Sequence, residues 1–186
     1  GLPTEMVTPE MRRDAKVVNF GIIYGMGRFG LSRQLKIPVN VADEYIQNYF
    51  VKYPGVKAYQ EQLLREALEK GYVTTIMNRR RPIPELLNSN KNIAANGERT
   101  AINTPIQGSA ADIIKSAMIR IRDALRAKSM RGRMILQIHD ELVLEAPEDE
   151  LEEAKKILKE GMEGVIRLDV PLIVDIGIGK NWSEAH

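Results

Sequence analysis

The sequence predicts an α+β protein with two subdomains, and three observations favour this fold class. Apolar residues recur at helical spacing over most of the first half of the chain. Two short apolar runs, 134–138 and 142–144, flank His139-Asp140-Glu141 as the strands of a hairpin flank its turn. Residues 172–178 alternate in the manner of a further strand. Because the first part is nearly all helical pattern and the last part mixes helices with strands, two subdomains of one α+β body are expected.

In the first half, particular residues mark the ends of the expected helices. Gly25 and Gly27 follow a proline-free stretch and are suited to end a helix. Asn40, with Asp43 three positions later, resembles a capping box at a helix start, and Gly71 is suited to a helix end. The expected helices cover residues 11–24, 40–53 and 56–70, and short strands at 72–77 and 81–83 are expected around a turn at Asn78.

In the second half, Pro105 is expected to interrupt a helix, because proline lacks the backbone N–H and clashes with the preceding turn. The helix should resume beyond it, where Ile114, Ala117 and Ile121 are spaced for burial. The expected elements are helices over 93–103, 110–127 and 149–165, the hairpin described above, and a closing strand over 172–178.

The composition excludes several classes of protein. With 44% hydrophobic and 28% charged residues, the chain is expected to fold. It has neither a run of about 20 apolar residues nor a basic-then-apolar start, so we predict a cytoplasmic protein without a membrane span. The absence of cysteine excludes disulfides and thiolate metal sites. A metal would have to be held by carboxylate, imidazole or carbonyl groups, which favours hard cations such as Mg²⁺.

The charge is unevenly distributed along the sequence. A net charge of +2 and a pI of about 8.8 are too mild to indicate nucleic-acid binding by themselves. Basic residues nevertheless gather at the start of the first expected helix, at 79–81 and over 120–133, whereas 148–163 is acid-rich. The chain begins with Gly1 in place of methionine, so we expect it to be a piece of a longer protein.

Residues 25–30 contain a formal G-x-G-x-x-G, made by Gly25, Gly27 and Gly30. A dinucleotide-binding loop needs these glycines directly after a strand and at the start of a helix, where backbone amides hold the pyrophosphate. Here the glycines follow a helical pattern instead. We therefore interpret them as a turn that ends a helix.

The helix before this turn carries Arg12, Lys16, Phe20 and Tyr24 at intervals of four. Each step of four residues turns only about 40° around the helix, so two cations and two rings share a face. One interpretation is an ordinary amphipathic helix with basic side chains in solvent and rings in the core. The other is a ligand site, because cations at one end suit a triphosphate and rings at the other suit a base or sugar.

The second candidate site is the hairpin tip, where Asp140 and Glu141 are adjacent and His139 precedes them. Carboxylates at such a tip can hold Mg²⁺ while waters and substrate phosphates complete its shell. A polar turn without a ligand is the alternative interpretation.

The third candidate site is a series of polar residues spaced by four, Arg99, Asn103 and Gln107. Amide side chains can donate to the minor-groove acceptors that all base pairs share, and an arginine can bind a phosphate. Helix capping by Asn103 near Pro105 is the alternative interpretation.

Taken together and in this order, these stretches resemble family A DNA polymerases, the bacterial DNA polymerase I type. The similarity extends over nearly the whole chain. The residues that carry it are Arg12-Arg13-x-x-Lys16-x-x-Asn19-Phe20-Gly21-x-x-Tyr24-Gly25, Pro105-x-Gln107-Gly108-x-Ala110-Ala111-Asp112, His139-Asp140-Glu141 and Gly177-x-Gly179-x-x-Trp182.

The resemblance implies part of the right-hand polymerase architecture, with the fingers subdomain in residues 1–97 and the C-terminal part of the palm in 98–186. The first helix would be the mobile helix of the fingers, which rotates onto an incoming deoxynucleoside triphosphate (dNTP). On this helix, the resemblance implies that Arg12 and Lys16 hold the phosphates. Phe20 would pack on the sugar and base, and Tyr24 would lie beside the insertion site.

The resemblance also implies the reaction and its partners. A primer 3′-hydroxyl would attack the α-phosphate of the dNTP, with two Mg²⁺ ions stabilising the entering and leaving oxygens. Asp140 would be a metal ligand with Glu141 beside it, and these two carboxylates with Lys16 would form the catalytic set. The contacts to primer-template DNA would come from Arg99, Asn103, Gln107 and His139.

One departure from the family concerns the metal site. The strand that carries the family's other essential metal aspartate has no counterpart between Gly1 and Met11, and no thumb is present. We therefore expect these parts to be supplied by an upstream portion of the same polymerase, which would be monomeric when complete. The chain by itself is expected to bind nucleotide only weakly and not to polymerise.

Two alternatives to this function remain open at this point. A single-subunit RNA polymerase shares the palm chemistry, but its motifs usually lack the Asn-Phe-Gly found at 19–21 and have serine where this chain has Glu141. A noncatalytic nucleic-acid-binding half of a split polymerase, which works only with a partner chain, is the alternative from another class.

Overall fold

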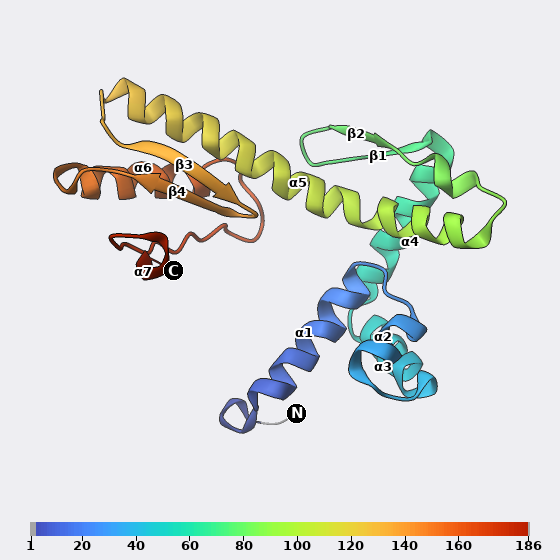
Figure 1. The fold of residues 1–186 in the computed structure, drawn as a ribbon. Helices are drawn as coiled ribbons and strands as arrows, with labels where there is room; N and C mark the ends of the chain where they lie inside the picture. Colours follow the sequence, from blue (N-terminus) through green and yellow to red (C-terminus); the bar gives the residue numbers. More distant parts are fainter. Residues whose placement is uncertain (1–2, 186) are drawn as a thin grey trace. The chain divides into compact units, whose positions relative to one another are not determined.

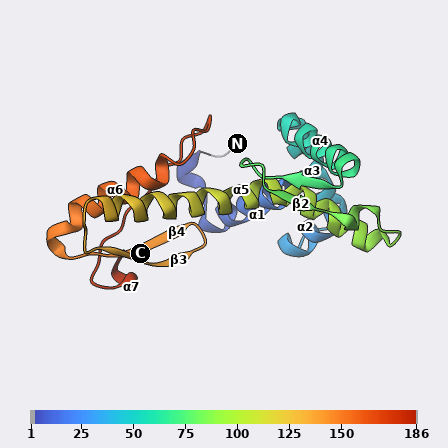
Figure 2. The same cartoon turned by 90° about the horizontal axis from the view of Figure 1, so that it is seen from above.

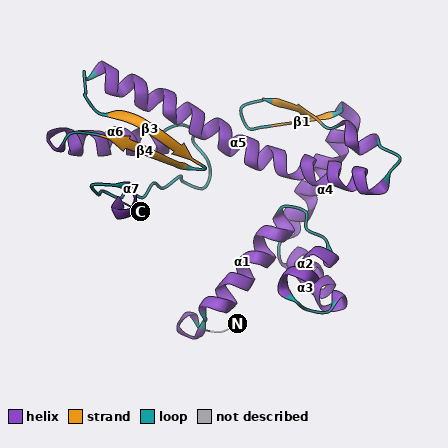
Figure 3. Cartoon of the chain, viewed as in Figure 1, coloured by secondary structure: helices purple, strands orange, loops and turns teal. Residues whose placement is uncertain are grey.

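The computed structural model describes residues 3–185, and the chain folds into two units, Gly1–Gly108 and Ser109–His186. Helices dominate the described residues, whose strands form two separate two-stranded antiparallel sheets (Figure 3). This architecture confirms the α+β class expected from the sequence.

The first unit is mainly helical (Figure 1). Its elements are a 3₁₀ turn (Thr4–Met6), α1 (Pro9–Ile23), α2 (Arg28–Leu35), α3 (Val39–Lys52), α4 (Pro54–Lys70), β1 (Tyr72–Thr74), β2 (Arg80–Pro82), a second 3₁₀ turn (Pro84–Leu87) and the first half of α5 (Lys91–Ala127). Helix α1 packs against α2 and α3. The buried cluster of this unit joins α4, the hairpin and α5 through Ala67, Val73, Ile83 and Ala101. Gly71, in the left-handed region at φ 74°, turns the chain from α4 into the hairpin as the sequence predicts.

Helix α5 runs through Pro105 without a break, so the expected interruption is wrong. Proline removes one backbone hydrogen bond and costs about 3 kcal/mol or more within a helix. Here the residues around it, Ala101, Ile102 and Thr104, are buried, and packing outweighs that local cost. The hairpin lies close to the same stretch, because a methyl group placed on Gly108 would come within 2.7 Å of Thr75 Cγ2.

In the second unit, helices pack alongside a β-hairpin (Figures 1 and 2). It contains the rest of α5, β3 (Arg133–Ile138), β4 (Glu141–Glu145), a 3₁₀ turn (Glu148–Glu150), α6 (Leu151–Glu163) and α7 (Trp182–Ala185). Its core joins α5, β4 and α6 through Ile121, Leu125, Leu142 and Ile157. The expected hairpin and the helix that follows it are therefore confirmed, with a register shift in β3 between Met134 and Leu136.

Two further expectations for local structure were wrong, and one helix was missed. The helix at Asn40 begins earlier, at Val39 after Pro38, and no side chain caps it. Helix α2 was not expected, because its sequence is short and contains a glycine. Residues 172–178 form no strand, because a strand needs a hydrogen-bonded neighbour and this segment pairs with neither β3 nor β4.

No helix among residues 3–185 is long and apolar enough to cross a membrane.

Candidate functional site

The first candidate site lies on α1, and residues next to each end of this helix cap it. At its start, the Thr8 hydroxyl accepts a hydrogen bond from the Met11 N–H at 3.2 Å. At its end, Gly25 adopts φ 78°, and its N–H donates to Ile22 O at 3.0 Å. The Met26 N–H donates to Gly21 O at 2.8 Å, which completes a Schellman motif. The glycine turn therefore ends a helix, as the sequence indicates.

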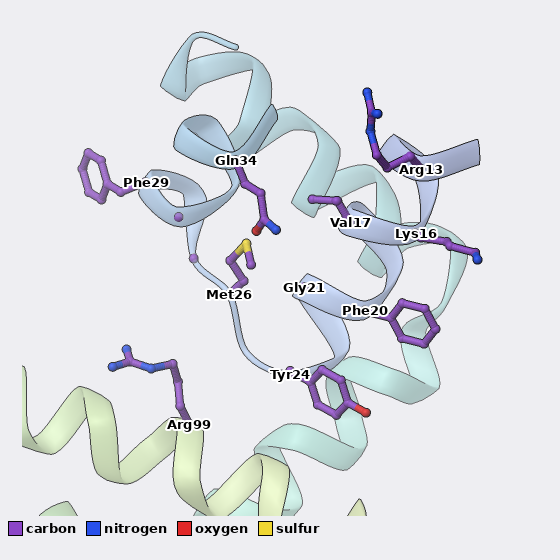
Figure 4. Close-up of a pocket in the computed structure, with 12 residues that line it drawn as sticks. Arg13, Lys16, Val17, Phe20, Gly21, Tyr24, Met26, Phe29, Gln34 and Arg99 are labelled. Atoms are coloured by element: carbon purple, nitrogen blue, oxygen red, sulfur yellow. The ribbon is translucent and has the colours of Figure 1, made fainter. Parts of the chain in front are cut away.

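A pocket of about 780 Å³ lies along α1 and α2 within the first unit (Figure 4). Val17, Met26 and Gln34 point into the space between the two helices, whereas Lys16 and Phe20 project from the side of α1 away from α2. The lining residues are Arg13, Lys16, Val17, Phe20, Gly21, Tyr24, Met26, Gly27, Phe29, Gly30, Gln34 and Arg99.

The lining combines positive charge with exposed aromatic rings. Three lining residues are cations, Arg13, Lys16 and Arg99, and the lining holds no carboxylate. Phe20 leaves 52% of its surface exposed and Phe29 65%, although both are large apolar side chains. A surface of this kind can take an anionic group together with a flat ring, because guanidinium and ammonium groups bind phosphates and exposed rings stack on bases.

Arg13 lines the pocket, whereas Arg12, which belongs to the series spaced by four residues, does not. Lys16, Phe20 and Tyr24 line it as expected, but Arg12 is exposed outside the lining and Arg13 takes its place. At about 100° per residue, Arg12 lies about 120° around the helix from Tyr24, whereas Arg13 lies only about 20° from it. Counting the drift per turn would have found Arg13 from the sequence. Its side chain pairs with Glu10 at 3.5 Å.

Two side chains, one on α3 and one on α4, make long-range hydrogen bonds to α1. The Tyr49 hydroxyl donates to Asn19 Oδ1 at 2.9 Å. Burial, with Tyr53 nearby, raises the pKa of Tyr49, so this phenol stays protonated and able to donate at neutral pH. The Gln60 amide donates to Ile22 O at 3.0 Å and to Ile23 O at 3.1 Å, which are carbonyls of the last turn of α1. No local pattern in the sequence indicated these contacts.

The polar series on α5 is only partly brought to this pocket. Arg99 lines it, next to the turn at Gly25, where a methyl group would lie 3.5 Å from Arg99 Cγ. The Asn103 amide oxygen is buried and accepts no hydrogen bond from the described residues. Gln107 is exposed and lies outside the lining.

The second candidate site is the turn of the β3–β4 hairpin in the other unit. Ile138 pairs with Glu141, so His139 and Asp140 form a two-residue turn, with His139 in the left-handed region at φ 54°. The Gln137 amide donates to His139 O at 2.6 Å and closes the turn on one side. On the other side, the Trp182 indole N–H donates to Glu141 Oε1 at 2.8 Å.

The carboxylates at the turn differ in their surroundings. Asp140 is exposed and makes no hydrogen bond or ion pair with the described residues, whereas Glu141 is half-buried against Trp182. Within residues 3–185, no group of three or more His, Asp or Glu side chains is arranged to hold a metal ion.

The helix with cations and exposed rings and the Asp–Glu hairpin turn follow one another along the chain in the same order as the motifs that resemble family A DNA polymerases. The chain belongs to DNA polymerase family A, whose sequence profile matches residues 1–184.

Two of its relatives, both called DNA polymerase I, are longer proteins. DNA polymerase I of Bacillus subtilis (strain 168) is 53% identical over 179 residues, covering 96% of this chain and 20% of the relative. DNA polymerase I of Pseudomonas aeruginosa is 47% identical over 186 residues, covering 100% of this chain and 20% of the relative. The chain thus spans about a fifth of the length of these curated relatives.

A solved structure supports the same family at the level of the fold. The structure described as "POL domain of Pol1 from M. smegmatis complex with DNA primer-template and dNTP" matches with a TM-score of 0.95 and 42% identity. The match covers 99% of this chain and 32% of that chain.

Proposed function

We propose that this chain is the part of a DNA-directed DNA polymerase that binds the incoming dNTP on α1 and supplies one carboxylate of the metal site. The observation that carries this proposal is the α1 pocket, whose lining includes three cations and two exposed rings and contains no carboxylate. The related polymerase domain of known structure is described in complex with DNA primer-template and dNTP, which supports the same partners here.

On this proposal, the residues of α1 divide the work of binding the dNTP. Arg12 and Lys16 hold the phosphates, and Arg13, which lines the pocket with Lys16, adds positive charge beside them. Phe20 packs on the sugar and base, and Tyr24, at the end of the helix, contacts the base pair being formed.

At the turn, Asp140 fits the role of a Mg²⁺ ligand, because its carboxylate is exposed and engaged by no described group. Bound Mg²⁺ would stabilise negative charge on the oxygens that enter and leave the α-phosphate. Asp140 would contribute one ligand, and Glu141 would lie beside it in an orientation set by Trp182. The remaining ligands of a two-metal site would come from an upstream part of the same polymerase.

The remaining expectations from the sequence become part of this proposal. Residues 1–97 would act as fingers and 98–186 as the C-terminal part of the palm, with primer-template contacts from Arg99, Asn103, Gln107 and His139. The complete polymerase would be monomeric and would act on DNA in the cytoplasm. Its catalytic steps would depend on positioning and charge, because nucleotidyl transfer requires little covalent chemistry from the protein.

A noncatalytic half of a split polymerase is a second candidate, and one observation favours it. Residues 3–185 contain no cluster of three metal-binding side chains, as expected of a half that works only with a partner chain. The RNA polymerase alternative is not carried forward, since the matching family is a DNA polymerase family.

The proposal can be tested in a chimera in which residues 1–186 replace the matching fifth of Bacillus subtilis DNA polymerase I. The chimera should extend a primer, and Lys16→Ala should raise KM for dNTP by about tenfold to a hundredfold, as expected for a lost charge-assisted phosphate contact. Lys57→Ala, an exposed lysine of α4 outside the pocket, is the matched control and should leave KM unchanged. A folded chimera that cannot extend a primer, or an unchanged KM in Lys16→Ala, would contradict the proposal.

A further inference from the structure

We propose that Trp182 is a positioning residue for the carboxylate pair, because its indole N–H holds Glu141 in one orientation beside Asp140. The inference deepens the proposed function and rests on it for the role of the turn in catalysis. The contact joins residues 41 positions apart, so the segment after α6 reaches back to the hairpin tip.

The chemistry of the contact suits orientation. An indole N–H is a donor with no acceptor capacity, and the carboxylate of Glu141 is acceptor-only when ionised. The 2.8 Å bond from Nε1 to Oε1 therefore fixes the position of one carboxylate oxygen. Trp182 adds no charge to the site, so it can orient Glu141 without neutralising it.

The local structure around Trp182 fixes the backbone that carries its ring. Trp182 is the first residue of α7, and the Glu184 N–H donates to Asn181 Oδ1 at 3.1 Å in front of the helix. The Glu184 carboxylate in turn accepts from the Lys180 N–H at 3.1 Å and from the Asn181 amide at 2.6 Å. These reciprocal bonds form a capping box, which fixes the backbone from which the indole extends.

The turn is thus held from two directions. Gln137 bonds to His139 O from β3, and Trp182 bonds to Glu141 from the closing segment. Between these two contacts, Asp140 keeps its carboxylate exposed. Partners that orient the groups around a metal commonly change metal affinity or activity by about 10- to 100-fold when they are removed. We assign this orienting role to Trp182.

The first test uses the 186-residue chain and needs no activity. Trp182 is the only tryptophan, so its indole N–H gives one assignable nuclear magnetic resonance signal. This proton should exchange slowly with solvent in the wild type and in Glu141→Gln, whose amide oxygen still accepts. Its exchange should become about tenfold faster or more in Glu141→Leu. Glu145→Leu, at the far end of β4, is the matched control and should leave the signal unchanged.

The second test separates positioning from a merely structural role, in the same active chimera. Trp182→Phe keeps a ring but loses the donor, and it should lower kcat by about tenfold with KM for dNTP unchanged. Trp182→His keeps a ring N–H and should restore part of kcat. Full kcat in Trp182→Phe, or an indole signal indifferent to Glu141→Leu, would overturn the inference. An inactive wild-type chimera would instead refute the proposed function, while the indole signal still reports whether the contact exists.

Discussion

The glycine turn after α1 permits a matched comparison, because two of its glycines have different backbone requirements. Gly25 lies in the left-handed region at φ 78°, whereas Gly27 is extended at φ −84° and ψ 171°. We expect Gly25→Ser to destabilise the first unit and Gly27→Ser to leave it as stable or slightly more stable. Both substitutions introduce the same side chain two positions apart.

The magnitude follows from the geometry of each site. A serine at Gly25 costs about 1–2 kcal/mol because a side chain is unfavourable in the left-handed region. Its Cβ would lie 3.4 Å from Ile102 Cδ1, which is ordinary contact and adds little. At Gly27 nothing lies within 4 Å of the new Cβ, and serine is a favourable residue in front of a helix. Both variants restrict the unfolded chain equally, so the two free energies of unfolding should differ by about 1–2 kcal/mol.

The chain carries spectroscopic probes for this measurement. All six tyrosines lie in the first unit and the single tryptophan lies in the second. Urea unfolding followed by tyrosine near-ultraviolet circular dichroism therefore reports the first unit, and indole fluorescence reports the second as an internal control. If the tyrosine signal gave the same free energy of unfolding for Gly25→Ser and Gly27→Ser, it would refute the inference that the left-handed backbone at position 25 requires glycine.

Three further predictions concern contacts that lie inside one unit or the other. Gln60→Leu removes two hydrogen bonds to the end of α1 and should destabilise the first unit by about 1–2 kcal/mol in urea unfolding, whereas the exposed Gln62→Leu on the same helix should cost less than half as much. Glu150 accepts backbone N–H bonds from the loop after α5, first from Arg131, and these bonds lower its pKa. Its contribution should be present above the unfolded-state value of about 4.3 and be lost as pH falls through the lower folded value. The stability difference between wild type and Glu150→Gln, measured by indole fluorescence, should therefore vanish in acid, and a difference that persists there would contradict this reasoning. Gly161→Ala places a methyl group on the buried Ile121 and should destabilise the second unit by about 1–2 kcal/mol, since overpacking outweighs the gain in helix propensity; a more stable variant in the same assay would show that the core yields.

The sequence predicted those elements whose signals are local. Helix α1, the end of α4 at Gly71 and the hairpin turn at His139 all follow from nearby residues that start or stop a segment. The interruption at Pro105 was wrong because burial of the surrounding helix outweighs the backbone cost. The strand at 172–178 was wrong because alternation records a preference for pairing and cannot supply the neighbour.

The candidate site shows the same division between local and long-range information. Helical geometry brought Lys16, Phe20 and Tyr24 to one pocket, because they share a single element. Phe29 joins them through α2, which the sequence did not reveal, and Gln60 and Trp182 act across dozens of residues. Such contacts depend on the tertiary fold, and no spacing rule within one segment can anticipate them.

The packing of Met26 links this fold to oxidative chemistry. Its thioether lies against Gly21 of α1 so closely that a methyl group there would come within 3.1 Å of the sulfur, and Gly30 of α2 leaves similarly little room. Conversion of a methionine to its sulfoxide adds a polar oxygen to the sulfur. At this position the added oxygen would have to displace one helix from the other or rotate the side chain into the pocket. An oxidant could therefore disable the nucleotide-binding surface without touching any charged or aromatic residue on it, and a methionine sulfoxide reductase could restore it.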